Sequence, residues 1–277
     1  MAHWNRLLAV LAGSAIAAIV QPQLAMALTP EEIAEIAREI TVRIDGPNSG
    51  SGVIVDFDRD TNTYTVLTNW HVVEDLGTYQ VQTSDGRIHQ VPIISGHQLE
   101  KFDLAVLQFS SEVEYQVAEL GDPEDLSHGT VVYVSGWANP DGISPNRYYR
   151  FEDGQITAIV EPQGEGYSLV YPNISKPGMS GGPILDEDGD LVGINGQVVI
   201  DARLGTVDSL GIPTDDRFLT AYGVFEYPSD YDIRCSTEVI HTNNLKYRPS
   251  LCLDDLDTPG GIWGGGGRRS LPPSLQK

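Results

Sequence analysis

The sequence predicts an all-β fold, a barrel or sandwich of short strands with one helix before it and one near its end. Three observations predict it: short runs rich in Val, Ile and Tyr, turn residues between those runs, and the lack of any fixed-period repeat. The expected strands cover residues 41–44, 52–55, 64–68, 80–83, 104–109, 131–134, 155–160, 168–171 and 191–194. The lack of a repeat excludes solenoids and propellers.

The chain begins with a stretch typical of an export signal. Arg6 supplies a positive charge, residues 7–20 are apolar or small, and Ala25-Met26-Ala27 fits the small-x-small cleavage rule. These 14 residues are too few to cross a bilayer, which needs about 20. We therefore expect residues 1–27 to be removed, leaving a periplasmic or secreted protein with no stable membrane anchor.

A helix is expected over residues 28–40. Thr29 can cap it, Pro30 stands at the first helical position, and Glu32 stands at the third, where its side chain can complete a capping box. The helical spacing then places four apolar residues on one face, namely Ile33, Ile36, Ala37 and Ile40. This face is expected to pack against the strands that follow.

The main β domain is expected to span residues 41–226. Asp85-Gly86 is a hairpin signal within it, and a second helix is expected after residues 212–214. Residues 227–277 predict an irregular extension that ends in a disordered tail, because glycine, arginine and proline replace core formers there. Its two cysteines, Cys235 and Cys252, either form a disulfide in an oxidising compartment or remain buried thiols.

The chain is strongly acidic. Its formal charge is −22, from 17 Lys and Arg against 39 Asp and Glu. Such a surface repels phosphate backbones, which argues against a nucleic-acid partner.

Three residues together suggest nucleophilic catalysis. Ser180 lies among closely spaced glycines and prolines, where the backbone can expose a hydroxyl, but a serine needs a base. His71 ends a predicted strand, and Asp103 stands at the entry to an apolar strand, where a buried carboxylate needs a partner. A histidine N–H meets that need, so the three supply nucleophile, base and orienting acid.

Three segments around these residues resemble the signature blocks of trypsin-like serine peptidases of the chymotrypsin fold. They are TNWHVV at 68–73, DLAVL at 103–107 and GMSGGP at 178–183. GSGVI at 50–54 and LVGIN at 191–195 also resemble blocks of the HtrA-type bacterial branch, although no PDZ domain is evident. The resemblance implies two six-stranded antiparallel β-barrels, with the boundary between them near 111–130.

It also implies roles for individual residues. Ser180 would attack the substrate carbonyl, with His71 as base and Asp103 as its orienting acid. The backbone N–H groups of Gly178 and Ser180 would form the oxyanion hole. The specificity pocket would include Ile174, Asn195, Gly196 and Gln197. None of these is acidic, so the expected substrate is a protein or peptide cleaved after a small or medium apolar residue.

Met179, before the serine, is neutral. Digestive relatives have an aspartate there, which pairs with a new N-terminal ammonium after zymogen cleavage. We therefore expect no such activation.

Two other function classes remain to be weighed. The Gly-x-Ser-x-Gly spacing around Ser180 also fits an α/β-hydrolase, but that class needs its acid and histidine after the serine, and only His241 follows. A catalytically weak or inactive peptide-binding protein on the same fold is the non-enzyme alternative. No cofactor or metal is expected, since no His-Glu-x-x-His or paired Cys-x-x-Cys motif is present. The oligomeric state stays open.

Overall fold

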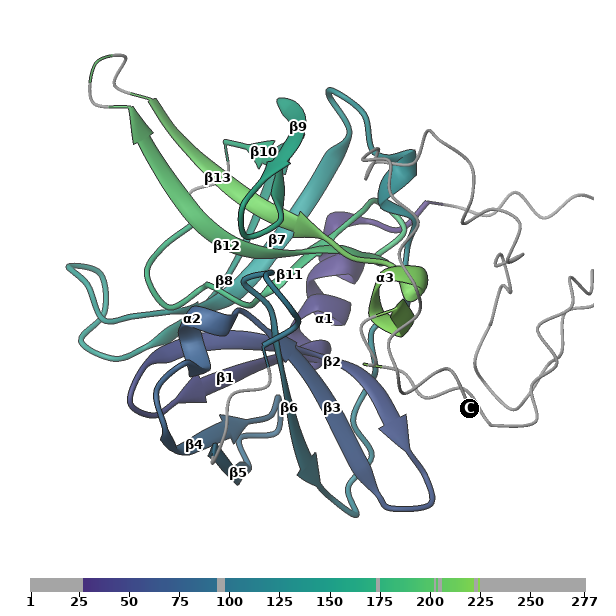
Figure 1. Ribbon diagram of the computed structural model, residues 1–277, viewed down its shortest axis with the longest axis vertical. Coiled ribbons are helices and arrows are strands. Elements are labelled where there is room, and N and C mark those ends of the chain that lie inside the picture. The colour runs from purple at the N-terminus through teal and green to yellow at the C-terminus, as the bar shows by residue number, and fades with distance from the viewer. Residues whose placement is uncertain are drawn as a thin grey trace, which may run out of the picture.

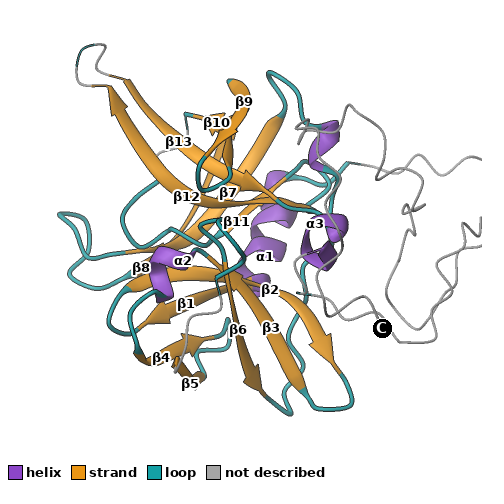
Figure 2. Ribbon diagram, viewed as in Figure 1, coloured by secondary structure: helices purple, strands orange, loops and turns teal. Residues whose placement is uncertain are grey.

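The computed structural model describes residues 27–93, 98–172, 175–201, 203, 206–221 and 224. Two antiparallel sheets make up most of it, one in the lower and one in the upper half of Figure 1, and helices are few (Figure 2). The first helix, α1 (Pro30–Ile40), packs against one strand of each sheet. The all-β prediction is therefore confirmed.

The first sheet has six strands, the number that the resemblance implied, and five of them were expected from the sequence. Its order is β5-β4-β1-β2-β3-β6, and its strands are β1 (Thr41–Asp45), β2 (Ser49–Asp58), β3 (Thr63–Thr68), β4 (Gly77–Gln82), β5 (Ile88–Ile93) and β6 (Ala105–Ser110). The two edge strands meet through side chains, because the ring of His89 on β5 stacks on Phe109 of β6 with centroids 4.2 Å apart. The sheet thus curves into a barrel.

The second sheet has seven strands, where the sequence predicted six. Its order is β8-β7-β11-β12-β13-β10-β9, and its strands are β7 (Val131–Ala138), β8 (Tyr148–Gln155), β9 (Ala158–Gln163), β10 (Tyr167–Tyr171), β11 (Pro183–Leu185), β12 (Leu191–Asp201) and β13 (Thr206–Pro213). The edge strands β8 and β9 are consecutive in the chain. At the bend between them, Ile156 N–H bonds to Thr130 O and Thr157 N–H bonds to Val170 O. One bent segment therefore closes this barrel and is counted as two strands.

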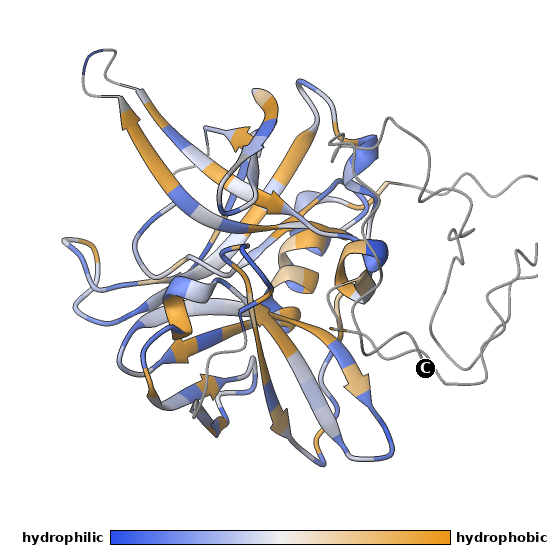
Figure 3. Ribbon diagram, in the orientation of Figure 1, coloured by the Kyte–Doolittle hydropathy of each residue, from blue (hydrophilic) through white to orange (hydrophobic). Residues whose placement is uncertain are grey.

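Helix α1 has the predicted cap and the predicted buried face. The Thr29 hydroxyl accepts the N–H of Glu32, and the Glu32 carboxylate accepts the N–H of Thr29. Ile33, Ala37 and Ile40 are buried in a core cluster that includes residues of both sheets. Figure 3 shows apolar residues on α1 and along the strands around it. The helix therefore stabilises the junction between the two barrels.

Three short helical segments complete the described chain. They are α2 (Trp70–Val73), the 3₁₀ turn η1 (Pro123–Asp125) and α3 (Asp216–Ala221). Helix α3 is the expected second helix, and its Phe218 ring packs edge-on against Phe102, with centroids 5.1 Å apart. No helix among the described residues is long and apolar enough to cross a bilayer.

Several sequence predictions fall outside the described residues. These are the export signal up to residue 26, Ile174 of the expected pocket, the extension from 227 to 277, and both cysteines.

Candidate active site

His71 and Asp103 are held together at the junction of the two sheets. His71 lies in α2, which follows directly after β3, and Asp103 lies just before β6 (Figure 1). The ring Nδ1 of His71 is 2.6 Å from Oδ2 of Asp103, and the backbone N–H of His71 donates to Oδ1 at 2.8 Å. Asn69 Nδ2 donates to the backbone oxygen of Asp103 at 2.8 Å. The carboxylate thus fixes both the ring and the backbone of His71.

The pKa values of the pair move apart. Burial alone would raise the pKa of Asp103, but hydrogen bonds from His71 and Tyr167 and the charge of His71 outweigh it, so the pKa lies below its usual value. Burial alone would lower the pKa of His71, but the hydrogen bond and charge of Asp103 outweigh it, so that pKa lies above its usual value. Asp103 is therefore ionised at neutral pH.

Ser180 stands in a tight turn between β10 and β11. Its carbonyl accepts the N–H of Ser51 at 2.7 Å, and a Cβ added to Gly50 would touch both that carbonyl and Val72 of α2. The turn therefore lies against the helix that carries His71. In this conformation the Ser180 hydroxyl donates to Gly196 O at 3.0 Å, and within the described residues it has no hydrogen bond to the His71 ring. Such contacts are often made only with substrate bound.

The peptide before Gly178 is fixed in one orientation. The carbonyl of Pro177 accepts the N–H of Asn139 at 2.7 Å, and in a trans peptide the N–H of Gly178 then points the opposite way. No hydrogen bond of the described residues uses the N–H of Gly178 or of Ser180. Two backbone donors in this turn thus have no acceptor among the described residues.

Glycine is required at position 178. Its φ is +94°, and an added Cβ would lie 2.6 Å from Asn139 Oδ1 and from Trp137 O. Both the backbone conformation and the space therefore exclude a side chain.

A buried arginine, which sequence reasoning missed, holds the other side of this turn. The Arg147 side chain is 5% exposed, and it bonds Asp45 Oδ1 at 2.7 Å. Four backbone carbonyls accept its remaining bonds: Ile44 at 2.6 Å, Gly50 at 2.7 Å, Trp137 at 2.7 Å and Gly178 at 3.1 Å. Its partners come from both sheets and from the turn. No local pattern indicates this role for Arg147, since it precedes a half-exposed strand.

The predicted pocket residues lie in different environments. Asn195 is fully buried, and its amide bonds Ser175, Met179 and Tyr171 at 2.9–3.0 Å. Gly196 is buried beside the Ser180 hydroxyl, and Gln197 is exposed. Asn195 therefore supports the serine turn from inside.

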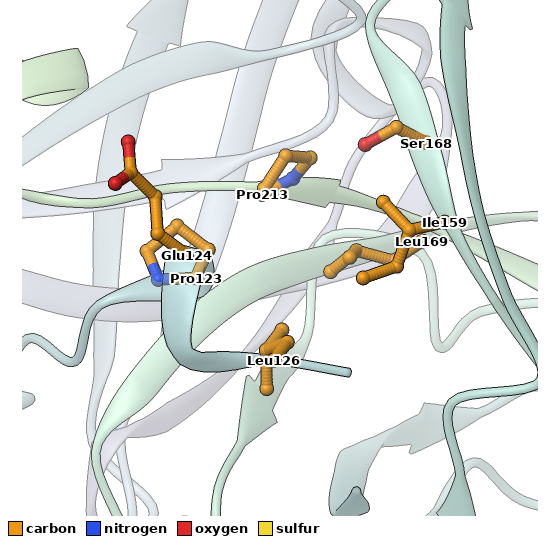
Figure 4. A pocket seen from close by; sticks show the side chains of 7 residues that line it. All are labelled: Pro123, Glu124, Leu126, Ile159, Ser168, Leu169 and Pro213. Carbon is orange, nitrogen blue, oxygen red and sulfur yellow. The ribbon is translucent and has the colours of Figure 1, made fainter. Parts of the chain in front are cut away.

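A separate cavity of about 320 Å³ contains none of these residues. It lies between η1 and strands β9, β10 and β13, and its walls are Pro123, Glu124, Leu126, Ile159, Ser168, Leu169 and Pro213 (Figure 4). Among the described residues, no group of His, Cys, Asp and Glu side chains is placed to hold a metal ion.

A family model for the trypsin-like peptidase domain matches residues 50–194, which include His71, Asp103 and Ser180. The chain belongs to this family. The trypsin-like peptidase resembles "Serine protease Do-like HtrA" of Bacillus subtilis (strain 168), with 31% identity over 61% of this chain and 37% of the relative. It is 33% identical to "Serine protease HTRA1" of Xenopus tropicalis over 53% of this chain and 31% of the relative. It thus spans about a third of these relatives' length.

The fold has solved counterparts. The structure "HtrA-type protease AlgW with tripeptide" matches with a TM-score of 0.55 and 24% identity, covering 70% of this chain and 62% of the other. At this identity the likeness shows the fold, which is the chymotrypsin-like fold that the sequence predicted.

Proposed function

We propose that this trypsin-like peptidase is a serine endopeptidase that hydrolyses protein or peptide substrates through an acyl-enzyme. The observation that carries the proposal is the bidentate hold of Asp103 on the ring and backbone of His71, beside a turn that presents Ser180. The relatives' names, which describe serine proteases, support the same reaction. The alternative, an inactive peptide-binding protein, is not favoured because the chain has all three residue types that the reaction needs, at His71, Asp103 and Ser180.

The reaction follows from these positions. Rotation about the Ser180 Cα–Cβ bond turns Oγ from Gly196 O toward His71 Nε2, which takes the proton as Oγ attacks the substrate carbonyl carbon. The free N–H groups of Gly178 and Ser180 stabilise the oxyanion. His71 then gives the proton to the leaving amine, and water hydrolyses the acyl-enzyme in the same way.

Labelling with a fluorophosphonate probe, together with hydrolysis of a peptide library, tests this proposal. The full chain should be labelled and should cleave peptides, while Ser180→Ala should lose about 10⁶-fold in kcat and all labelling. Ser144→Ala is the matched control, because Ser144 lies in an exposed turn. Equal turnover by Ser180→Ala and the parent would disprove the assignment.

We further infer that the serine turn does not depend on a zymogen ammonium. Met179 is neutral and fully buried, so an ammonium inserted there would lack a counter-charge. Arg147 instead supplies an internal cation to the carbonyl of Gly178. Removal of residues 1–27 should therefore be the only processing that the enzyme needs, and N-terminal sequencing of exported protein should begin at Leu28.

We also propose a preference for small or medium apolar side chains at the cleavage site. Gly196 and the exposed Gln197 stand on an edge of β12 that no described strand covers beyond Asn195, so substrate backbone can pair there. Sequencing of library products gives the preference directly. Predominant cleavage after Arg, Lys or Glu would contradict it.

A further inference from the structure

The Asp103 carboxylate has a third donor besides the two from His71. The hydroxyl of Tyr167 donates to Oδ2 at 2.5 Å, and this is the same oxygen that the His71 ring contacts. Tyr167 belongs to β10 of the second sheet and is buried, with 6% of its surface exposed. Both sheets therefore contribute a group to the acid of the proposed triad.

Tyr167 also explains the glycine at position 196. A Cβ added to Gly196 would collide with the Tyr167 hydroxyl and would lie 2.5 Å from Cε1 and 2.7 Å from Cζ of the ring. The φ of Gly196 lies outside the left-handed region, so its backbone does not itself require glycine. Position 196 therefore requires glycine because any side chain there would occupy the space of the Tyr167 ring. A side chain at 196 would point to the place from which Asp103 receives its third hydrogen bond.

We propose that Tyr167 is a positioning residue of the catalytic site, which orients the Asp103 carboxylate toward His71 and draws negative charge from the oxygen that they share. This inference rests on the proposed peptidase function. Gly196 is its necessary companion, because only glycine leaves room for the tyrosine. Tyr167 supplies a neutral donor from β10, the strand that precedes the serine turn, and Gly196 leaves the space that the tyrosine occupies.

The donor keeps its proton under all working conditions. Burial and the negative charge of Asp103 both raise the pKa of Tyr167 far above its usual value. The hydroxyl therefore remains a donor across the pH range in which His71 titrates. Its hydrogen bond favours the ionised form of Asp103 and reduces the charge density that Oδ2 presents to the ring.

Tyr167→Phe in the full chain removes this hydroxyl and keeps the ring. We expect kcat to fall about 10–100-fold with little change in KM, since the change affects the base and not the substrate-binding edge. The pKa of His71 should rise, because Oδ2 then presents more negative charge to the ring. Tyr64→Phe is the matched control: Tyr64 is equally buried, but its hydroxyl bonds Val113 and Tyr115, away from the triad.

A side-chain exchange separates positioning from packing. Tyr167→Ala should lose activity, and adding Gly196→Ser to it should restore at least about tenfold, because the serine hydroxyl can reach the vacated place beside Oδ2. Adding Gly196→Ala to Tyr167→Ala fills similar space without a hydroxyl and should restore nothing. Equal recovery with alanine would overturn the proposal in favour of simple packing.

Titration of the His71 ring by NMR gives a readout that does not depend on turnover. A higher His71 pKa in Tyr167→Phe than in the parent and in Tyr64→Phe supports the positioning role even if the parent cleaves no peptide, in which case only the proposed function fails. If Tyr167→Phe changes neither kcat nor the His71 pKa, the proposed role of Tyr167 is wrong. Loss of labelling in Ser180→Ala would still support the peptidase function in that case.

Discussion

Replacing Arg147 by lysine should slow acylation of Ser180 while the protein remains folded. Of the five hydrogen bonds of the guanidinium, one reaches the serine turn, at the carbonyl of Gly178. Lysine keeps the positive charge and can pair with Asp45. Its single nitrogen cannot also span the carbonyls that the two guanidinium nitrogens reach.

The size of the effect follows from that one bond. A hydrogen bond to a charged group contributes about 1.5–3 kcal/mol, so its loss lowers the population of the ordered turn about 10–100-fold. Complete loss of an oxyanion donor would cost about 10²–10³-fold, which sets the upper limit. The Ser51 hydroxyl still holds Gly178 O at 2.8 Å, so we expect a value near the lower end.

The assay is the second-order rate of fluorophosphonate labelling per folded molecule, with thermal unfolding measured beside it. Asp45→Asn is the control, because it removes the charge partner of Arg147 and leaves the contact with Gly178 intact. This control should lower the Tm and keep the labelling rate. A parental labelling rate in Arg147→Lys would refute the idea that Arg147 holds the turn.

Three further predictions concern the base, the oxyanion turn and α1. The acid limb of kcat/KM should lie above about pH 6.5, because the folded environment raises the pKa of His71, whose neutral form is the proposed base. It should move to lower pH in Asp103→Asn, and identical pH profiles would argue against the pairing. Gly178→Ala should lower labelling about 10²–10³-fold, since its Cβ would collide with Asn139, whereas Gly142→Ala, with open space around it, should have no effect. Ile33→Ala should lower the free energy of unfolding by about 2–5 kcal/mol in denaturant titrations, because Ile33 is buried. Protein that starts at Leu28 should react with the fluorophosphonate probe while α1 is still attached. Labelling that appears only after removal of residues 28–40 would instead identify α1 as a propeptide.

The sequence predicted those helices and strands that are specified by residues close together in the chain. The cap of α1 was visible because Thr29, Pro30 and Glu32 act within one turn of chain. Four strands were missed, namely β5, β8, β11 and β13. Strand β8 is half-exposed along most of its length and so shows no alternating pattern, while β11 is apolar but has only three residues and begins with proline, too short a run to predict a strand.

The residues of the candidate site also fall into two groups, those in a recognisable sequence motif and those placed only by long-range contacts. His71, Asp103 and Ser180 could be predicted because each stands in a recognisable segment, and the structure pairs His71 with Asp103. Tyr167 and Arg147 have no such segment. Tyr167 meets a residue 64 positions earlier, and Arg147 meets carbonyls up to 103 positions away. Only the closure of the two barrels brings these groups together, so single-sequence patterns cannot indicate them.

The close fit of Tyr167 against Gly196 also restricts how this site can change during evolution. A side chain at 196 collides with the tyrosine ring, and loss of the tyrosine alone leaves Asp103 with one donor fewer. Either single substitution should weaken the proposed enzyme. A lineage therefore reaches the alternative pair, a small residue at 167 with serine at 196, only through a less active intermediate or by two substitutions in quick succession. Substitutions at these two positions should therefore be found together in descendants of a common ancestor, and chimaeras that mix the two solutions should be the least active.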